Sequence, residues 1–379
     1  MSGPLAGIQV VEVASIGPGP FAAMVLADLG ASVTRVERKG GGAAVVLQDA
    51  MLRGRDASIA LDLKQPEGVE VLLRLTATAD VLIEGFRPGV MERLGVGPDE
   101  CLARNPGLVY GRITGWGQDG PRAPTAGHDI DYLAIAGALH PIGPPDRPPP
   151  PPLILVADFG GGGMLLVAGV LAALVERAES GKGQVVDAAM AEGAALLTTM
   201  FHGLAAAGLW TGDRGANLLD GGAPFYRCYL TGDGGFMAVG ALEPQFYAAL
   251  LSGLGLDGED LPDQYDRTGW PRLAERFAAV FAARSRADWT KVFEGTDACV
   301  APVLAMSEAA ADRHASARGG FIEVDGVTQP APAPRFSRSQ VGSPVGGRAP
   351  GGDARGVLAR LGYSTADIEA LLGGAVGGG

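Results

Sequence analysis

The chain has 379 residues, 47% of them hydrophobic and 19% charged, so it can bury a large core and is not a disordered polypeptide. This length is comfortable for two domains. A formal net charge of −12 argues against non-specific binding of nucleic acid.

The first quarter predicts strands that alternate with helices. The segment Ile8–Val13 has the pattern of a strand, Gly17–Pro20 of a turn, and Phe21–Leu29 of a helix that Gly30 can terminate. The elements expected next are strands at Val33–Val36, Asp80–Phe86 and Leu108–Thr114 and a helix at Gly68–Thr76. This alternation predicts an α/β fold with a parallel, doubly wound sheet.

Two nucleotide-binding motifs are absent from the glycine-rich loops. The turn GPGPF after the first strand lacks the third glycine of G-x-G-x-x-G, and its prolines remove amide donors that a pyrophosphate would need. The glycines after Asp158 are not followed by the Lys-Ser/Thr pair of a P-loop. Neither loop therefore predicts a nucleotide site.

The later elements divide the chain further. The longest apolar run, Phe159–Val175, is slightly short for a membrane span and predicts a buried core helix. A final helix is expected within Ala354–Leu372, capped by Ser364 or Thr365. Between these lie a proline-dense connector at Pro144–Pro152, a turn into a short strand at Gly181–Val186, an α+β segment from about Asn217 to Asp297, and a linker at Ala331–Phe336.

Basic residues gather in the first hundred positions. A cationic cluster in an acidic protein suits a small polyanionic ligand, and the alternative is surface charge that balances acids such as Glu37 and Asp62. The cluster comprises Arg35, Arg38, Lys39, Arg53, Arg55, Lys64, Arg87 and Arg93.

His128 in GHDIDY and Asp158 in VADFGGGG are the most informative titratable residues. An imidazole and a carboxylate that converge on one carbon can remove a proton from one face and return it to the other. The alternatives are a structural histidine and an aspartate that caps the apolar helix.

The other histidines and the cysteines do not predict a metal or a nucleophile. His140, His202 and His314 lack acids at ligand spacing and are read as structural. The three cysteines, Cys228 among them, are far apart, which suits a reduced, cytoplasmic location. The start of the chain has no signal-peptide pattern, and no membrane span is expected.

Several blocks in the same order resemble the family III CoA-transferase superfamily and, within it, the α-methylacyl-CoA racemases. They are GPGPFAAMVLADLGASVTRVER, IEGFRPGVMERLG, GRITGWGQDGPRAPTAGHDIDY, LVADFGGGG, SGKGQVVDAAMAEG, ANLLDGGAPFY, ALEPQFY and PAPAPRFSR. The resemblance implies two chains interlocked as a homodimer, each with a large Rossmann-like domain and a smaller α+β domain, and an active site between the large domain of one subunit and the small domain of the other. The implied ranges are 1–190 for the large domain, 191–216 for a linker helix, 217–315 for the small domain, 316–330 for a linker and 331–379 for a tail that returns to the large domain.

The resemblance also assigns roles to residues. His128 and Asp158 would be the two bases, and Glu243 would reach across the dimer to hydrogen-bond His128. No metal or redox cofactor is implied, since CoA is part of the substrate. Residues expected to bind CoA or the acyl group are Arg38, Leu61, Asp62, Leu63, Lys64, Gly85, Phe86, Arg87, Arg93, Gly127, Asp129, Ile130, Asp131 and Tyr132. Arg35 and Arg55 are interpreted as possible surface groups.

Three functions remain open at this point. A racemase of 2-methylacyl-CoA thioesters would form an enolate, held by backbone amides around Asp158. A CoA-transferase would use Asp158 as a nucleophile and would not need His128. A non-catalytic protein would only bind CoA. The family pattern has Asn where this chain has Ile154, so the acyl group that the enzyme prefers is not predicted.

Overall fold

The structure, a computed structural model, describes residues 3–41 and 49–377, and its contacts divide the chain into two compact units. Met1 and Ser2, part of the start that carries no signal-peptide pattern, lie outside the described residues. The large unit takes in described residues from 1–136, 153–197 and 316–379, and the small unit takes in 137–152 and 198–315.

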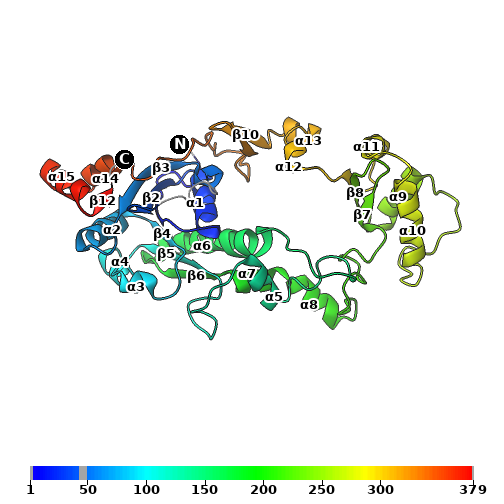
Figure 1. The fold of residues 1–379 in the computed structure, drawn as a ribbon, viewed down its shortest axis with the longest axis horizontal. Helices are drawn as coiled ribbons and strands as arrows, with labels where there is room; N and C mark the ends of the chain where they lie inside the picture. The colour runs from blue at the N-terminus through cyan, green and yellow to red at the C-terminus, as the bar shows by residue number, and fades with distance from the viewer. Residues whose placement is uncertain (1–2, 42–48, 378–379) are drawn as a thin grey trace. The chain divides into compact units, whose positions relative to one another are not determined.

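A seven-stranded sheet forms the centre of the large unit (Figure 1). Its order is β12-β3-β2-β1-β4-β5-β6, and every neighbouring pair is parallel except β12 with β3. The strands are β1 (Gln9–Val13), β2 (Ser32–Arg38), β3 (Arg55–Leu61), β4 (Val81–Glu84), β5 (Val109–Thr114), β6 (Val185–Ala189) and β12 (Val376–Gly377).

This topology confirms the predicted parallel sheet and adds β3 and β12 to it. The strand order reverses between β1 and β4, so the connections from these two strands leave in opposite directions. Such a reversal opens a crevice at the carboxyl ends of the strands, where ligands of open α/β sheets bind.

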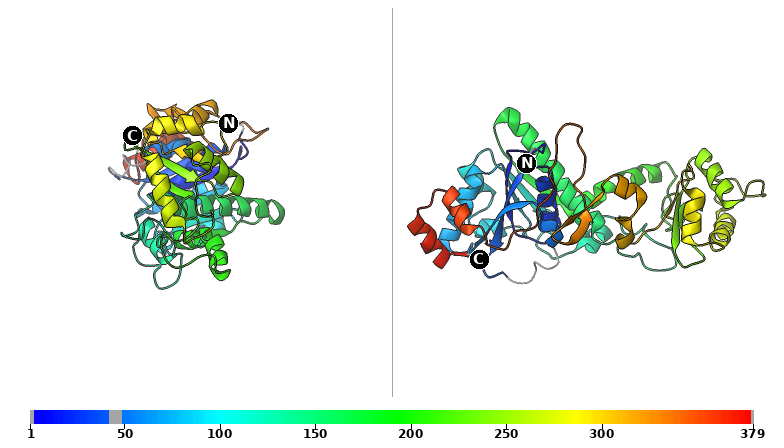
Figure 2. Two further views of the ribbon diagram at one scale, coloured as in Figure 1. Left: turned by 90° about the vertical axis from the view of Figure 1, so that its right-hand side faces the viewer. Right: turned by 90° about the horizontal axis from the view of Figure 1, so that it is seen from above.

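Helices cover both faces of the sheet. One cluster of buried apolar residues joins one face to α2, α3, α4, α14 and α15, and α1 and α6 pack on the other. The C-terminal helices, red in Figures 1 and 2, thus lie beside strands from the start of the chain. The bounds are α1 (Pro18–Asp28), α2 (Pro66–Thr78), α3 (Val90–Arg93), α4 (Pro98–Arg104), α6 (Leu165–Ser180), α14 (Ala354–Arg360) and α15 (Thr365–Gly373), with a 3₁₀ turn η2 at Asp49–Leu52. Ser364 caps α15 by accepting from the Asp367 amide, as predicted.

The long apolar helix differs from its prediction in where and how it begins. It starts as a π-helix, η3 (Leu155–Met164), and continues as α6. Glycines in the π segment allow α7 (Met190–Leu197) and α1 to pack closely against it. A Cβ at Gly161 would lie 2.7 Å from the Ala194 amide of α7, and one at Gly163 would lie 2.7 Å from Phe21 of α1. Neighbouring helices therefore approach the η3 backbone directly.

By length and composition the stretch Leu155–Ser180 could cross a membrane, which corrects the expectation that it is too short. In the large unit α6 packs on β5 and β6, where a Cβ at Gly169 would meet Val186 at 2.6 Å. A core helix passes the same test of length and composition, so the finding is weak evidence for a membrane span.

The predicted linker at 316–330 contains a β-hairpin. Strands β10 (Phe321–Val324) and β11 (Val327–Pro330) pair antiparallel. Arg53 donates to Gln329 at 2.7 Å and to the Pro330 carbonyl at 2.7 Å, which holds the hairpin to the large unit.

The small unit is built around an antiparallel sheet of three strands and an aromatic core. Phe225, Tyr229, Tyr247, Trp270 and Phe277 are all buried there. The elements are β7 (Tyr226–Leu230), β8 (Phe236–Gly240), β9 (Val300–Pro302), α8 (Thr199–Ala206), α9 (Pro244–Leu254), α10 (Trp270–Phe281), α11 (Arg286–Phe293) and α12 (Met306–Ala309), with α13 (Arg313–Ala317) at its boundary.

Candidate active site

Asp158 lies in the first turn of η3, next to the start of α1. A Cβ built on Gly17, the residue before α1, would lie 3.3 Å from the carboxylate oxygen Oδ2 of Asp158, a tight contact, and the φ of Gly17 is 72°, a conformation that favours glycine. Burial raises the pKa of Asp158 to about 6, the negative charge of Asp129 adds to the rise, and His128 opposes it. Asp158 therefore exchanges protons close to neutral pH.

The amides at the start of η3 are already occupied. Asp129 is 2% exposed, and its Oδ1 accepts from the amides of Ala157 at 2.8 Å and Asp158 at 2.9 Å. The expectation that amides around Asp158 would hold an enolate oxygen is therefore wrong for these two donors, since both are paired with a buried carboxylate.

His128 is the N-cap residue of α5 (Asp129–Ile135), and its side chain is exposed. Its amide donates to Oδ2 of Asp131 at 3.0 Å, the reciprocal half of a capping box. The backbone of α5 and this bond set the direction in which the imidazole leaves the helix start.

Tyr132 and Trp116 support the loop that precedes His128. The Tyr132 hydroxyl donates to the Gly127 carbonyl at 2.5 Å, and the two rings meet edge to face with centroids 4.8 Å apart. A Cβ at Gly115 would lie 2.3 Å from the Tyr132 ring, and one at Gly127 would lie 2.7 Å from it. Both glycines therefore admit the tyrosine ring beneath the histidine loop.

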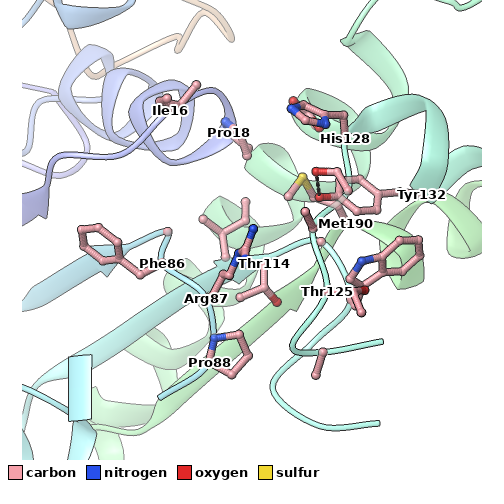
Figure 3. Close-up of a pocket in the computed structure, with 18 residues that line it drawn as sticks. Ile16, Pro18, Phe86, Arg87, Pro88, Thr114, Thr125, His128, Tyr132 and Met190 are labelled. Carbon is pink, nitrogen blue, oxygen red and sulfur yellow. Dashed lines mark hydrogen bonds between the residues drawn. The ribbon is translucent and has the colours of Figure 1, made fainter. Parts of the chain in front are cut away.

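A cavity of about 400 Å³ lies at the carboxyl ends of β1, β4, β5 and β6 in the large unit. His128 and Asp158 both line it, as do Gly127 and Tyr132 (Figure 3). The loop after β4 adds Gly85, Phe86, Arg87 and Pro88 to its wall. The structure thus brings the two proposed bases, thirty residues apart in the sequence, to one cavity.

Sequence reasoning missed several residues of this wall. Among the wall residues that were not predicted are Ile16, Pro18, Thr114 and Trp116. A usable signal was present, because most of them follow directly on a predicted parallel strand, and carboxyl ends of such strands share one edge.

A second, smaller cavity of about 150 Å³ lies at the ends of β1, β2 and β3. Phe86 lines both cavities, so the two adjoin at this ring. The other proposed CoA-binding residues in its wall are Arg38, Leu61, Asp62, Leu63 and Lys64. The side chains of Arg38 and Lys64 are exposed, which leaves both cations available to a ligand.

Three members of the basic cluster serve the fold instead. Arg55 is 1% exposed and donates to Glu12 at 2.9 Å, and Arg35 pairs with the same carboxylate. Arg53 pairs with the buried Asp28 at 2.5 Å. The interpretation of Arg35 and Arg55 as surface groups is wrong, because their guanidinium groups are buried against Glu12, a carboxylate of β1.

Other proposed residues lie outside the two cavities. Arg93 ends α3 and is exposed, and Ile130 and Asp131 are exposed on α5. Ile154, where the family has Asn, precedes η3, is 46% exposed, and accepts the Phe159 amide through its carbonyl. Glu243 belongs to the small unit, where it is the exposed N-cap residue of α9.

Among the described residues, no group of three His, Cys, Asp or Glu side chains could hold a metal ion. Of the remaining histidines, His140 contacts the Gly212 carbonyl at 3.2 Å within the small unit.

Comparison with known proteins gives consistent matches over most of the chain. The model of CoA-transferase family III matches residues 5–352. The α-methylacyl-CoA racemase of Mus musculus is 50% identical over 88% of this chain and 87% of its own length, and that of Homo sapiens is 46% identical over 86% of each. A crystal structure of a CAIB/BAIF family protein from Brucella suis superposes with a TM-score of 0.81 at 28% identity, covering 95% of this chain and 100% of that one.

Proposed function

Since this chain belongs to CoA-transferase family III, with two racemases among its relatives, we propose that it interconverts (2R)- and (2S)-2-methylacyl-CoA thioesters. The observation that carries the proposal is that His128 and Asp158 line one cavity at the carboxyl ends of the sheet.

The reaction moves a proton across one carbon through an enolate. One base removes the α-proton while the other, already protonated, returns a proton to the opposite face. Two bases that gain and lose protons near neutral pH suit both directions of such a reaction. Burial and the charge of Asp129 raise the pKa of Asp158 to about 6, and imidazoles titrate in the same range.

The two adjoining cavities suit the two ends of an acyl-CoA. The smaller one offers apolar walls from Leu61 and Leu63 for an adenine and the exposed cations Arg38 and Lys64 for phosphates. The pantetheine would pass Phe86, which borders both cavities, and present the thioester to His128 and Asp158.

The rival function is CoA transfer with Asp158 as the nucleophile. A transferase has no use for an imidazole in the same cavity. His128 lines the cavity together with Asp158. This observation favours proton transfer.

The deciding experiment is incubation with a 2-methylacyl-CoA in heavy water, with and without an acceptor acid. We expect deuterium at the α-carbon without an acceptor, and loss of this exchange in His128→Ala. CoA transfer that requires an acceptor and leaves the α-carbon unlabelled would refute the proposal, as would near-normal exchange in His128→Ala. A protein that binds CoA but labels and transfers nothing would be a binding protein.

We further propose that the active enzyme is a homodimer, as the family resemblance implies. Large apolar side chains of the large unit support this, since Leu153, Leu155 and Leu197 are each more than half exposed. A dimer would cover such side chains. In analytical ultracentrifugation, Leu155→Glu should shift the wild-type dimer towards monomer, and a monomeric wild-type protein would contradict the proposal.

A further inference from the structure

Asp129 joins the two segments that carry the proposed bases. It follows His128 directly as the first residue of α5, and its side chain accepts hydrogen bonds from the consecutive backbone amides of Ala157 and Asp158. We propose that Asp129 is a positioning residue that holds the bases in register and keeps Asp158 supplied with its proton. This inference rests on the proposed racemase function.

The geometry is that of a tether. One oxygen, Oδ1, accepts from two consecutive amides at 2.8 and 2.9 Å, and the residue is 2% exposed. Because His128 and Asp129 share a peptide bond, this pair of hydrogen bonds couples the position of the imidazole to that of η3. A displacement of either segment would break both bonds.

The other oxygen of Asp129 is unusual. Oδ2 is buried and has no hydrogen-bond partner among the described residues. Buried polar atoms are almost always paired, and an exception often marks a functional group. The negative charge is therefore not neutralised locally, and its field acts on a titratable neighbour.

That neighbour is Asp158. After burial, the charge of Asp129 is the cause that raises the pKa of Asp158, and His128 is the group that lowers it. Burial raises the pKa of Tyr132 to about 12, and the charge of Asp158 adds to the rise, so Tyr132 also lies close to Asp158. An anion beside a second carboxyl group disfavours ionisation of that group.

Other charges on the elements packed against η3 are exposed or already paired. Asp28 of α1 pairs with Arg53, and Arg112 of β5 pairs with Glu84 and Glu92. Arg177 of α6 pairs with Asp80. The remaining ones are exposed on their elements: Asp131 on α5, Glu192 on α7, Asp187 on β6, and Glu176 and Glu179 near the end of α6. Asp129 is thus the buried anion that can act on Asp158.

A two-base reaction needs one base protonated and the other free. When two groups of similar acidity ionise independently, some molecules carry a proton on both bases and others carry a proton on neither. Both of these forms are inactive. By disfavouring the Asp158 anion, Asp129 enlarges the population in which Asp158 holds a proton and His128 is neutral.

The first variant removes the negative charge of Asp129 and keeps its hydrogen bonds to the two amides. In Asp129→Asn the amide oxygen can still accept both backbone bonds, so we expect the acid limb of the kcat/KM profile for α-deuterium exchange to move down by about one pH unit. In Asp129→Ala the tether is lost too, and we expect exchange to fall at least about tenfold at every pH. Glu192→Gln removes an exposed charge from α7, which packs against η3, and should leave the profile unchanged.

A second readout does not depend on turnover. The ¹³C resonance of the Asp158 carboxyl group, assigned by its loss in Asp158→Asn, should titrate about one unit lower in Asp129→Asn than in wild type. Asp129→Ser replaces the asparagine variant if that one does not fold. Identical titrations of Asp158 in wild type and Asp129→Asn would overturn the inference while leaving racemisation intact. A shifted titration in a protein that shows no α-exchange would refute the racemase function but not the effect of Asp129 on Asp158.

Discussion

Arg55 and Arg38 belong to one basic cluster in the sequence but have opposite expected roles, and replacing each by methionine separates them. Arg55 is 1% exposed and lies in β3, where its guanidinium donates to Glu12 at 2.9 Å. It also donates to three backbone carbonyls, those of Met51 at 2.6 Å, Arg53 at 3.0 Å and Pro20 at 2.8 Å. Arg38 ends the neighbouring strand β2 and is exposed beside the smaller cavity.

The structure sets the size of the expected effect. Removing one partner of a buried ion pair costs about 3–5 kcal/mol, because the other charge stays buried. Arg35 still pairs with Glu12 in Arg55→Met, which favours the lower end of that range, whereas three carbonyls lose their donor, which favours the upper end. We therefore expect a loss of about 4 kcal/mol in the free energy of unfolding, a large part of the total for a protein domain.

The assay is urea unfolding followed by circular dichroism, combined with CoA titration by calorimetry. Arg38→Met should change the free energy of unfolding by less than about 0.5 kcal/mol and weaken CoA binding about tenfold. Arg55→Met should lower stability and, where folded, keep its CoA affinity. An Arg55→Met protein as stable as wild type but with weakened CoA binding would refute the division of the cluster into structural and ligand-binding arginines.

The remaining predictions concern the catalytic cavity. The pKa of Asp158 rises from 3.8 to about 6 on folding, so ionisation of this group destabilises the folded protein fully above pH 6 and has no effect on stability below pH 3.8. In urea unfolding, Asp158→Asn should therefore stabilise the protein by about 1–2 kcal/mol at pH 7 but not at pH 3.5. Equal stability of the two proteins at pH 7 would contradict the raised pKa. Gly127→Ala places a Cβ 2.7 Å from the Tyr132 ring. It should lower the free energy of unfolding by about 1–3 kcal/mol and reduce α-exchange about tenfold or more. An unchanged melting temperature and exchange rate would show that the ring can move aside. If Glu243 hydrogen-bonds His128, Glu243→Gln should lower kcat for exchange about tenfold with little change in KM, and a variant affected only in KM would exclude that role.

Local sequence patterns predicted much of the fold. The strands β1, β2, β4 and β5 are short segments rich in Val, Ile and Leu and bounded by turn residues, and Ser364 stands where a capping residue is needed, so residue pattern and capping predicted them. The strand β3 was missed because it begins with Arg55 and is polar at its start, and a burial pattern of that kind depends on the neighbouring strands.

The candidate site divides in the same way. His128 and Asp158 were identified from the sequence, since few titratable residues lie in this region and their side chains suit proton transfer. The pairing of Asp129 with amides 28 and 29 residues away was not, because no local pattern records which backbone donors meet a buried carboxylate.

The sequence by itself determined the parallel α/β architecture and two side chains able to exchange protons, because these follow from periodicity and residue chemistry along the chain. The family was indicated by the resemblance of several sequence blocks. Only the tertiary structure decided that three of the arginines stabilise the fold, that the amides at the start of η3 are occupied, and that Asp158 is half-buried beside an anion. Charge, burial and hydrogen-bond pairing are properties of neighbours in space, and in this chain those neighbours lie tens of residues apart in the sequence.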